Sequence, residues 1–232
     1  MDNNNYQLLI TGANRGIGLE FVRQYAADNW QVIACCREPE AAPELQALTK
    51  QYPDIQVMAL DVGDFRQIDA LANQLKDTRI DVLINNAGIY PPSDFNHIDY
   101  EDWATAFKVN SMAPLKMAQA FSKHIARSQL KKLATLSSKM GSLDDNTSGG
   151  SYSYRTSKTA ANMVMKSLAI DLKPLGISVV TLHPGWVQTD MGGSNALIDA
   201  QTSVHGLRKV IANLSMSNTG KFIAYDGAEI PW

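Results

Sequence analysis

A tyrosine and a lysine stand four residues apart in the segment YSYRTSKTAANMVMKSLAIDL, at Tyr154 and Lys158. On a helix this spacing places both side chains on one face, one turn apart. A phenol titrates at a pKa of ~10, but a neighbouring ammonium favours the phenolate and lowers that pKa. The pair would therefore form a general acid or base that works close to neutral pH. Because the same spacing also occurs in ordinary surface pairs, other residues must support it; Tyr152, the nearest competitor, has Thr156 one turn later.

Two polar residues fall where the active site of a parallel sheet would need them. Ser138 follows the apolar run 132–137, at the edge where the carboxyl ends of parallel strands place their sites. Its hydroxyl could hold a substrate oxygen or simply cap a turn. Asn110 falls inside a helical stretch, where asparagine is mildly unfavourable, and it could serve either a site or a helix end.

A glycine-rich segment, TGANRGIG (11–18), lies between the first apolar run and the first helical pattern. Such a turn points backbone N–H groups and the positive end of a helix at an anion, and glycine lets a pyrophosphate approach closely. No Lys-Ser/Thr pair follows the last glycine, so the segment is not a Walker P-loop. We expect it to bind a dinucleotide through Gly12, Asn14, Arg15, Gly16, Ile17 and Gly18.

The end of the second apolar run, QVIACC (31–36), indicates which dinucleotide. A carboxylate there would bind the ribose hydroxyls of NAD, but this chain has Cys36 followed by Arg37. Arg37 and Arg15 both suit a 2′-phosphate, so NADP(H) is the expected cofactor. Glu38, one position further on, keeps NAD as the alternative, in which Arg37 is only a surface charge. The two adjacent cysteines are expected to be reduced thiols.

Apolar runs alternate with helical patterns along the chain. This alternation predicts βαβ crossovers, and continuous apolar runs suit a sheet that is covered on both faces. The expected structure is a single domain over residues 1–232, an α/β, doubly wound Rossmann fold with a seven-stranded parallel sheet and helices on both faces. The expected strands are 6–10, 31–36, 55–60, 80–85, 132–137, 177–183 and 221–225, and the expected helices are 16–29, 41–51, 64–76, 99–127, 152–173 and 201–214.

Composition excludes several classes of protein. The 232 residues include 45% hydrophobic and 19% charged residues, and the net charge is −2. These values exclude a disordered or fibrous chain and leave no strong field for a nucleic acid or an anionic membrane. The scattered histidines predict no metal site. The N-terminal segment MDNNNYQ lacks the pattern of a secretory leader, and no window reaches the ~18 apolar residues of a membrane span, so a cytoplasmic protein is expected.

Taken together, these motifs resemble the short-chain dehydrogenase/reductase family from residue 6 to the C-terminus. TGANRGIG matches the family's TGxxxGxG, NNAG (85–88) follows the fourth expected strand, and PGWVQT (184–189) matches the segment that holds the nicotinamide. The family's Asn-Ser-Tyr-Lys tetrad is complete. Within the family, ITGANRGIGLEFV, CCREP, YRTSK and GKFIAYDGAEIPW are similar to C-factor-like and sniffer-like carbonyl reductases.

The resemblance implies NADP(H)-dependent reduction of a carbonyl to an alcohol by hydride transfer. Tyr154 would donate the proton, Lys158 would lower the Tyr154 pKa and bind the nicotinamide ribose, and Ser138 would hold the substrate oxygen. Asn110 would hold a water molecule that connects Lys158 to solvent. Beyond the glycine-rich segment and Arg37, the implied cofactor-binding residues are Asp61, Val62, Asn86, Ala87, Gly88, Tyr154, Lys158, Pro184, Gly185, Val187 and Thr189.

The motifs leave an alternative function open and imply two kinds of partner. A cofactor-bound, C-factor-like signalling protein with little turnover is the alternative, whereas a methyltransferase would have no use for Tyr154 and Lys158. The implied partner is a small-molecule carbonyl or alcohol. The resemblance also implies a homodimer or homotetramer, since the helices near 99–127 and 152–173 are rich in apolar residues, namely Met112, Met117, Ala118, Met163, Met165 and Leu168.

The substrate is not encoded in any motif, because the variable loops 90–97, 140–152 and 190–204 would form its pocket. Tyr90 and Trp186 could line that pocket or fill the core. Ser138 and Tyr154 are sixteen residues apart, slightly more than is usual in the family, so the loop between them is expected to shape the pocket in its own way.

Overall fold

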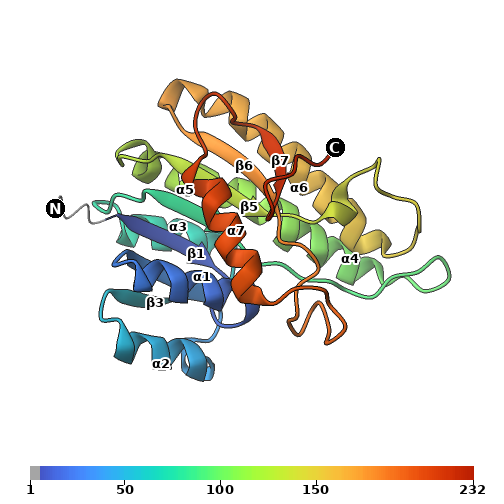
Figure 1. Ribbon diagram of the computed structural model, residues 1–232, viewed down its shortest axis with the longest axis horizontal. Coiled ribbons are helices and arrows are strands. Elements are labelled where there is room, and N and C mark those ends of the chain that lie inside the picture. Colours follow the sequence, from blue (N-terminus) through green and yellow to red (C-terminus); the bar gives the residue numbers. More distant parts are fainter. Residues whose placement is uncertain (1–5) are drawn as a thin grey trace.

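Successive side chains of a strand point to opposite faces of a sheet, and in this chain both sets are apolar. The computed structural model describes residues 6–232, in which seven parallel strands form one sheet with helices on both faces (Figure 1). The strand order is β3-β2-β1-β4-β5-β6-β7, which confirms the expected doubly wound fold. The strands are β1 (Gln7–Thr11), β2 (Gln31–Cys36), β3 (Ile55–Ala59), β4 (Val82–Asn85), β5 (Lys132–Leu136), β6 (Ser178–His183) and β7 (Lys221–Ala224).

Helices cover both faces and bury the two sets of strand side chains. Leu8 and Ile10 of β1 belong to the core beneath α1 and α7, whereas Leu9 belongs to the core beneath α3 and α5. This arrangement is the physical reason for the continuous apolar strands. The helices are α1 (Gly16–Ala27), α2 (Pro43–Gln51), α3 (Phe65–Gln74), α4 (Tyr100–Phe107), α5 (Ala113–Ala126), α6 (Tyr152–Asp171) and α7 (Ala200–Ala212).

Aspartate side chains fix the start of three helices. Asp64, Asp99 and Asp199 each accept a hydrogen bond from a backbone N–H in the first turn of α3, α4 and α7. These bonds satisfy donors that a helix leaves unpaired at its N-terminus. The capped helices therefore begin close to where the sequence pattern predicted.

The expected helix 99–127 is continuous but not uniform. A π-helical turn, Lys108–Met112, separates α4 from α5. Pro114 in the first turn of α5 has no N–H to donate to the carbonyl of Asn110, which favours a locally wider turn. Such turns are frequent at functional sites, and this one carries Asn110.

Other expectations concern the cysteines and the N-terminus. Cys35 and Cys36 are both buried and free, as expected. None of the helices within residues 6–232 has the length and apolar character needed to cross a membrane. Most of the MDNNNYQ segment, from which no secretory leader was expected, lies outside the described residues.

Candidate active site

The candidate active site lies at the carboxyl ends of β1, β4, β5 and β6. The glycine-rich segment follows β1, NNAG begins at the last residue of β4, Ser138 follows β5, and the Pro-Gly segment follows β6. β1 and β4 are neighbours at the point where the strand order reverses, which is where open α/β sheets bind ligands. The sheet therefore gathers four segments that are far apart in the sequence.

Ser138, Tyr154 and Lys158 form one cluster. Tyr154 and Lys158 are buried on the same face of α6, and Ser138 hydrogen-bonds the Tyr154 side chain. Lys158 Nζ lies 5.7 Å from the centre of the Tyr154 ring and donates to the Leu136 carbonyl at 2.8 Å. The Ser138 hydroxyl also accepts from the Met140 N–H, so it both caps a turn and touches the tyrosine.

Burial changes the proton affinities of both side chains on α6. It raises the pKa of Tyr154 to about 12, although the hydrogen bond with Ser138 acts in the opposite direction. Burial also lowers the pKa of Lys158 to about 8. The net shift of the Tyr154 pKa is upward because of burial, and the lowering expected from Lys158 stays a prediction for the cofactor-bound site. At neutral pH Tyr154 is a phenol and has a proton to donate.

The turn after β5 is fastened to α6 around Gly141. A Cβ at Gly141 would lie 2.9 Å from the backbone carbon of Lys158, so the turn and the helix touch without room for a side chain. Asn162 Nδ2 and Thr159 Oγ1 donate to the Gly141 carbonyl at 3.0 and 2.9 Å, and Ser137 Oγ donates to Asn162 Oδ1 at 2.5 Å. These bonds fix Ser138 relative to Tyr154 and Lys158.

Asn110 lies on the other side of Lys158, in the π-helical turn. Its side chain accepts from the Ile89 N–H and donates to the Ile89 carbonyl, both at 2.9 Å, and also donates to Ser157 Oγ at 3.0 Å. A Cβ at Gly88 would lie 3.2 Å from Asn110 Oδ1 and 3.4 Å from Lys158 Nζ. Asn110 is therefore close to Lys158, and its amide holds the segment that follows NNAG.

The glycine-rich segment leaves the start of α1 open to an anion. Arg15 stands at the N-cap position without a side-chain cap, unlike the aspartates at the starts of α3, α4 and α7, and no acidic residue lies in the first turn of α1. A Cβ at Gly18 would lie 2.0 Å from the Gly12 carbonyl, and Gly12 has a φ of +66°, so both positions require glycine. The first-turn N–H groups and the helix dipole suit a phosphate. Asn14, Gly16 and Ile17 lie in the same turn.

The NNAG segment is joined directly to the glycine-rich segment. Asn86 Nδ2 donates to the carbonyls of Thr11 and Gly12 at 2.9 Å, and the N–H groups of Asn86 and Ala87 donate to Thr11 Oγ1 at 3.1 Å. The Asn86 amide therefore holds two loops together. The structure places Ala87 and Gly88 between the glycine-rich segment and Asn110.

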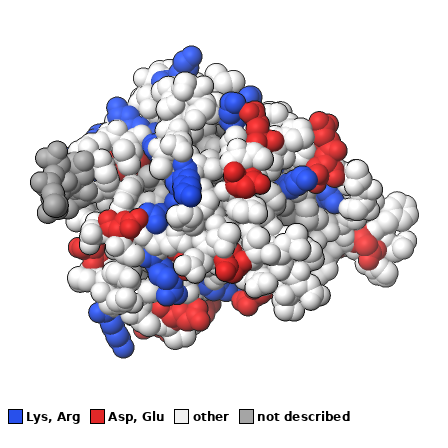
Figure 2. Space-filling view, viewed as in Figure 1, with Lys and Arg blue, Asp and Glu red and all other residues white. Residues whose placement is uncertain are grey.

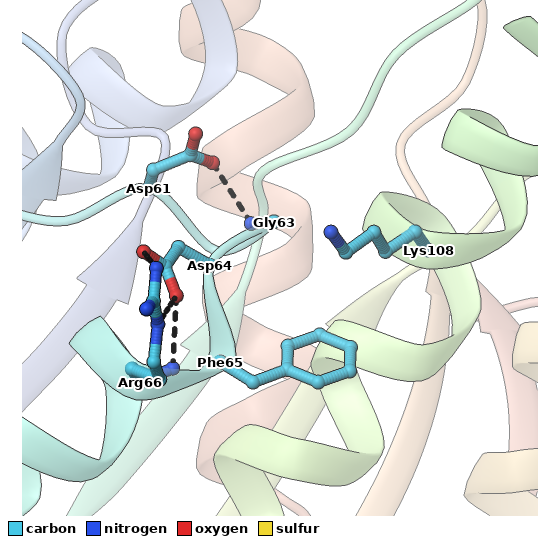
Figure 3. Close-up of a pocket in the computed structure, with 6 residues that line it drawn as sticks. All are labelled: Asp61, Gly63, Asp64, Phe65, Arg66 and Lys108. Carbon is cyan, nitrogen blue, oxygen red and sulfur yellow. Dashed lines mark hydrogen bonds and ion pairs between the residues drawn. The ribbon is translucent and has the colours of Figure 1, made fainter.

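An open cavity of about 520 Å³ lies beside Asp61 and Val62, two of the residues expected to bind the cofactor (Figure 3). Asp61 Oδ1 accepts from the Gly63 N–H at 2.8 Å, and Val62 is buried. On the opposite side of the cavity, Lys108 Nζ lies 5.8 Å from the centre of the Phe65 ring. The cavity thus has an apolar ring and polar groups of both charges, and its lining is Asp61, Gly63, Asp64, Phe65, Arg66 and Lys108.

The two arginines expected at the 2′-phosphate lie at the surface. Arg15 forms an ion pair with Asp190 at 3.0 Å, with side chains that are 66% and 76% exposed. Arg37 is exposed directly after β2. An exposed ion pair contributes little stability, so Arg15 can exchange Asp190 for another anion at small cost. On the face of the molecule drawn in Figure 2, basic and acidic side chains are interspersed rather than gathered in one basic patch.

The segment after β6 closes against the glycine-rich segment. Gly185 has a φ of +85°, and a Cβ there would lie 2.7 Å from Ile198. Val187 is buried and pairs with Ile198 in a short bridge. A Cβ at Gly16 would lie 3.1 Å from the Thr189 side chain, while the carbonyl of Pro184 accepts from Ser203 at 2.6 Å. All four residues expected here, Pro184, Gly185, Val187 and Thr189, belong to this segment.

Sequence reasoning missed some residues that shape the site. Asn162 follows Tyr154 and Lys158 at a further spacing of four, so the helical period of α6 could have revealed it. Thr11, Ser137 and Ser151 have no comparable signal, because their partners come from other segments. Tyr152 does not share the helix face of Tyr154 and Lys158. Thr156, one turn after Tyr152, accepts a hydrogen bond from Trp103 of α4 at 2.8 Å, so that side of α6 packs against α4.

Comparisons with known proteins agree with this geometry. The family model described as short chain dehydrogenase matches residues 7–197. The chain is 43% identical to C-signal of Myxococcus xanthus over 70% of this chain and 99% of that sequence. The carbonyl reductase Sniffer of D. melanogaster has a TM-score of 0.91 and 37% identity, covering 98% and 99% of the two chains. An NADPH-bound carbonyl reductase from chicken fatty liver has a TM-score of 0.92 and 35% identity, covering 97% and 94%.

The family match spans most of the chain, and solved structures of this likeness share its fold over nearly their whole length. The resemblance inferred from the motifs is thus confirmed. The chain belongs to the short-chain dehydrogenase/reductase family and is an oxidoreductase.

Proposed function

We propose that the protein reduces an aldehyde or ketone to an alcohol with NADPH as the hydride donor. The observation that carries this proposal is the cluster of Ser138 with the buried Tyr154 and Lys158, at the same sheet edge as an uncapped, glycine-rich helix start. Carbonyl reductases with the same fold, one of them with NADPH bound, support the choice of substrate class.

The residues present fit a dinucleotide. Glycine at positions 12 and 18 leaves a cradle that a Cβ would fill, and the first-turn N–H groups of α1 face it. NADP(H) rather than NAD(H) is favoured by Arg15 and Arg37 and by the neutral Cys36 at the end of β2. When bound, NADPH supplies the hydride.

Tyr154 is the proton donor in this proposal. Its raised pKa keeps the proton on the phenol at neutral pH, which suits a general acid for reduction. Ser138 is within hydrogen-bond reach of Tyr154, so one carbonyl oxygen can bind both hydroxyl groups. The two donors orient the carbonyl and stabilise the negative charge that develops on its oxygen.

Lys158 and Asn110 support the tyrosine. Lys158 contributes positive charge beside the phenol and has donors beyond its bond to Leu136 for a ribose hydroxyl. Asn110 fixes the backbone next to Lys158, where a water molecule could return a proton from solvent. The other cofactor contacts come from Asp61 and Val62, from NNAG, and from the segment after β6.

A screen of aldehydes, methyl ketones and diketones tests the proposal. NADPH oxidation is followed at fixed enzyme concentration, with NADH in parallel. Turnover of at least one carbonyl class with NADPH is expected. NADPH binding by fluorescence with no turnover of any carbonyl would contradict it.

The likeness to C-signal favours a second candidate, a signalling protein that binds the cofactor and turns over little. The intact cluster of Ser138, Tyr154 and Lys158 argues for the enzyme, since a binding module has no need for a buried lysine and phenol together. Binding without turnover in the same screen would favour the signalling candidate.

A further inference from the structure

A second tyrosine lies directly against the catalytic candidate. The rings of Tyr90 and Tyr154 have centroids 4.4 Å apart and planes tilted by 50°. Tyr90 follows Gly88 by two residues, so it belongs to the segment that Asn110 holds beside Lys158. The Tyr90 side chain is nevertheless 41% exposed. One part of its ring therefore contacts Tyr154, while another part is exposed.

The hydroxyl of Tyr90 is tied to the start of α6. Tyr90 Oη and Ser151 Oγ are 2.6 Å apart. Ser151 occupies the N-cap position of α6, where serine commonly caps the helix, yet its side chain makes no cap hydrogen bond. Its hydroxyl is used by Tyr90 instead. Ser153 N–H also donates to Ser93 Oγ at 3.0 Å, so the two segments are joined twice.

The long loop between Ser138 and Tyr154 ends at this tie and is itself held in place. Arg155 donates to the carbonyls of Met140 and Gly149 at 3.3 Å and to Ser148 Oγ at 2.8 Å. The backbone N–H of Arg155 donates to the Ser151 carbonyl at 2.8 Å. These hydrogen bonds hold the loop and Ser151, and Ser151 in turn holds the Tyr90 hydroxyl. The Tyr90 ring therefore has a fixed position beside Tyr154.

We propose that Tyr90 determines substrate specificity, its ring and its bond to Ser151 excluding carbonyl compounds with a bulky substituent on that side of Tyr154. The inference rests on the proposed carbonyl reduction. A reacting carbonyl oxygen must come within ~3 Å of the Tyr154 hydroxyl, so the groups on its carbon lie close to the Tyr90 ring. Aldehydes and methyl ketones fit there, whereas a ketone with two branched substituents meets the ring.

The first test replaces the ring. The ratio of kcat/KM for a straight-chain aldehyde to that for a ketone with two branched substituents is measured for the unaltered enzyme and for Tyr90→Ala. The ratio should fall about tenfold or more in Tyr90→Ala, because one or two methylene groups in a pocket change selectivity by ~10–200-fold. Phe95→Ala, which removes an exposed aromatic from the same segment, is the matched control and should leave the ratio unchanged.

The second test removes the bond but keeps the ring. Tyr90→Phe and Ser151→Gly each delete one hydroxyl, and glycine suits the backbone of Ser151, whose φ is +49°. Both variants should lower the ratio by a similar, smaller factor, and the double variant should add nothing further. NADPH affinity and melting temperature, measured for every variant, should stay close to those of the unaltered enzyme.

The outcomes separate this inference from the proposed function. Turnover of the aldehyde by the unaltered enzyme tests the proposed function on its own. An unchanged ratio in Tyr90→Ala, with NADPH affinity retained, would overturn the specificity role. An equal fall in kcat for both substrates would overturn it as well, because Tyr90 would then act on Tyr154 and not on the choice of substrate. If Tyr90→Ala does not fold, an unchanged ratio in both Tyr90→Phe and Ser151→Gly would contradict the proposal.

Discussion

At the scale of single residues, burial determines the chemistry of Tyr154 and Lys158. The sequence predicted their shared helix face, which the structure confirms, because a spacing of four needs only a regular helix. The direction of the Tyr154 pKa was not predictable. It depends on how much water the surrounding segments exclude and on the neighbouring Ser138 and Tyr90, and neither is visible in a local pattern.

The lowered Lys158 pKa gives a pH-dependent stability. The unfolded chain holds this proton up to its ordinary pKa of ~10.4, whereas the folded chain loses it near 8. Between these values the unfolded state binds more protons, so Lys158 makes the free energy of unfolding rise with pH. Relative to Lys158→Met, the unaltered protein should gain on the order of 2 kcal/mol between about pH 7 and about pH 10 in urea titrations. A difference between the two proteins that does not change with pH would contradict this account.

Cofactor choice also depends on single residues. A 2′-phosphate that binds Arg15 and Arg37 should favour NADPH over NADH by ~2–4 kcal/mol if both charge-assisted contacts form. The variant Cys36→Asp with Arg37→Ala should reverse this preference, because it supplies an acceptor for the ribose hydroxyls and removes a phosphate partner. Steady-state kinetics with both cofactors measure the effect. Equal or better kcat/KM with NADH in the unaltered enzyme would contradict it, and Glu38 would then be the ribose ligand.

At the scale of elements, the strands and helices were predictable because parallel strands buried on both faces are continuously apolar. The π-helical turn was not, since its cause lies in the missing N–H of Pro114 rather than in periodicity. The junction between β5 and α6 was also invisible. It depends on Gly141, whose contact with Lys158 arises only when the two elements meet.

Gly141→Ala should therefore disturb this junction. The added Cβ would lie 2.9 Å from the Lys158 backbone, and overpacking of this kind costs ~1–3 kcal/mol. We expect a lower free energy of unfolding in denaturant and a loss of turnover, because Lys158 and Ser138 must shift. Gly149→Ala, where a Cβ meets open space, is the control and should lose only the ~1–2 kcal/mol of its left-handed backbone. Equal stability of Gly141→Ala and the unaltered protein would contradict the account.

At the scale of the whole molecule, we propose a homodimer or homotetramer. Four of the apolar residues expected at this interface, Met117, Ala118, Met165 and Leu168, are instead buried in the core. Met112 before α5 and Met163 and Ile170 on α6 remain at the surface, the last two both 67% exposed. We propose that these exposed apolar side chains contribute to the interface.

Light scattering measures this assembly. The mass should be at least twice the 25.4 kDa of one chain at micromolar concentration. Met163→Glu with Ile170→Glu should reduce it to one chain, because the charges would be buried without partners in an interface. A mass near 25.4 kDa for the unaltered protein would contradict the proposal.

The central claim is that Tyr154 donates the proton for NADPH-dependent carbonyl reduction, and Tyr154→Phe tests it most directly. NADPH oxidation with an accepted aldehyde is compared among the unaltered protein, Tyr154→Phe and the matched control Tyr152→Phe, and NADPH affinity is measured by fluorescence. Turnover should fall ~10²–10⁴-fold in Tyr154→Phe, with NADPH affinity within severalfold, and should persist in Tyr152→Phe. Retained turnover in Tyr154→Phe, together with its loss in Tyr152→Phe, would contradict the assignment.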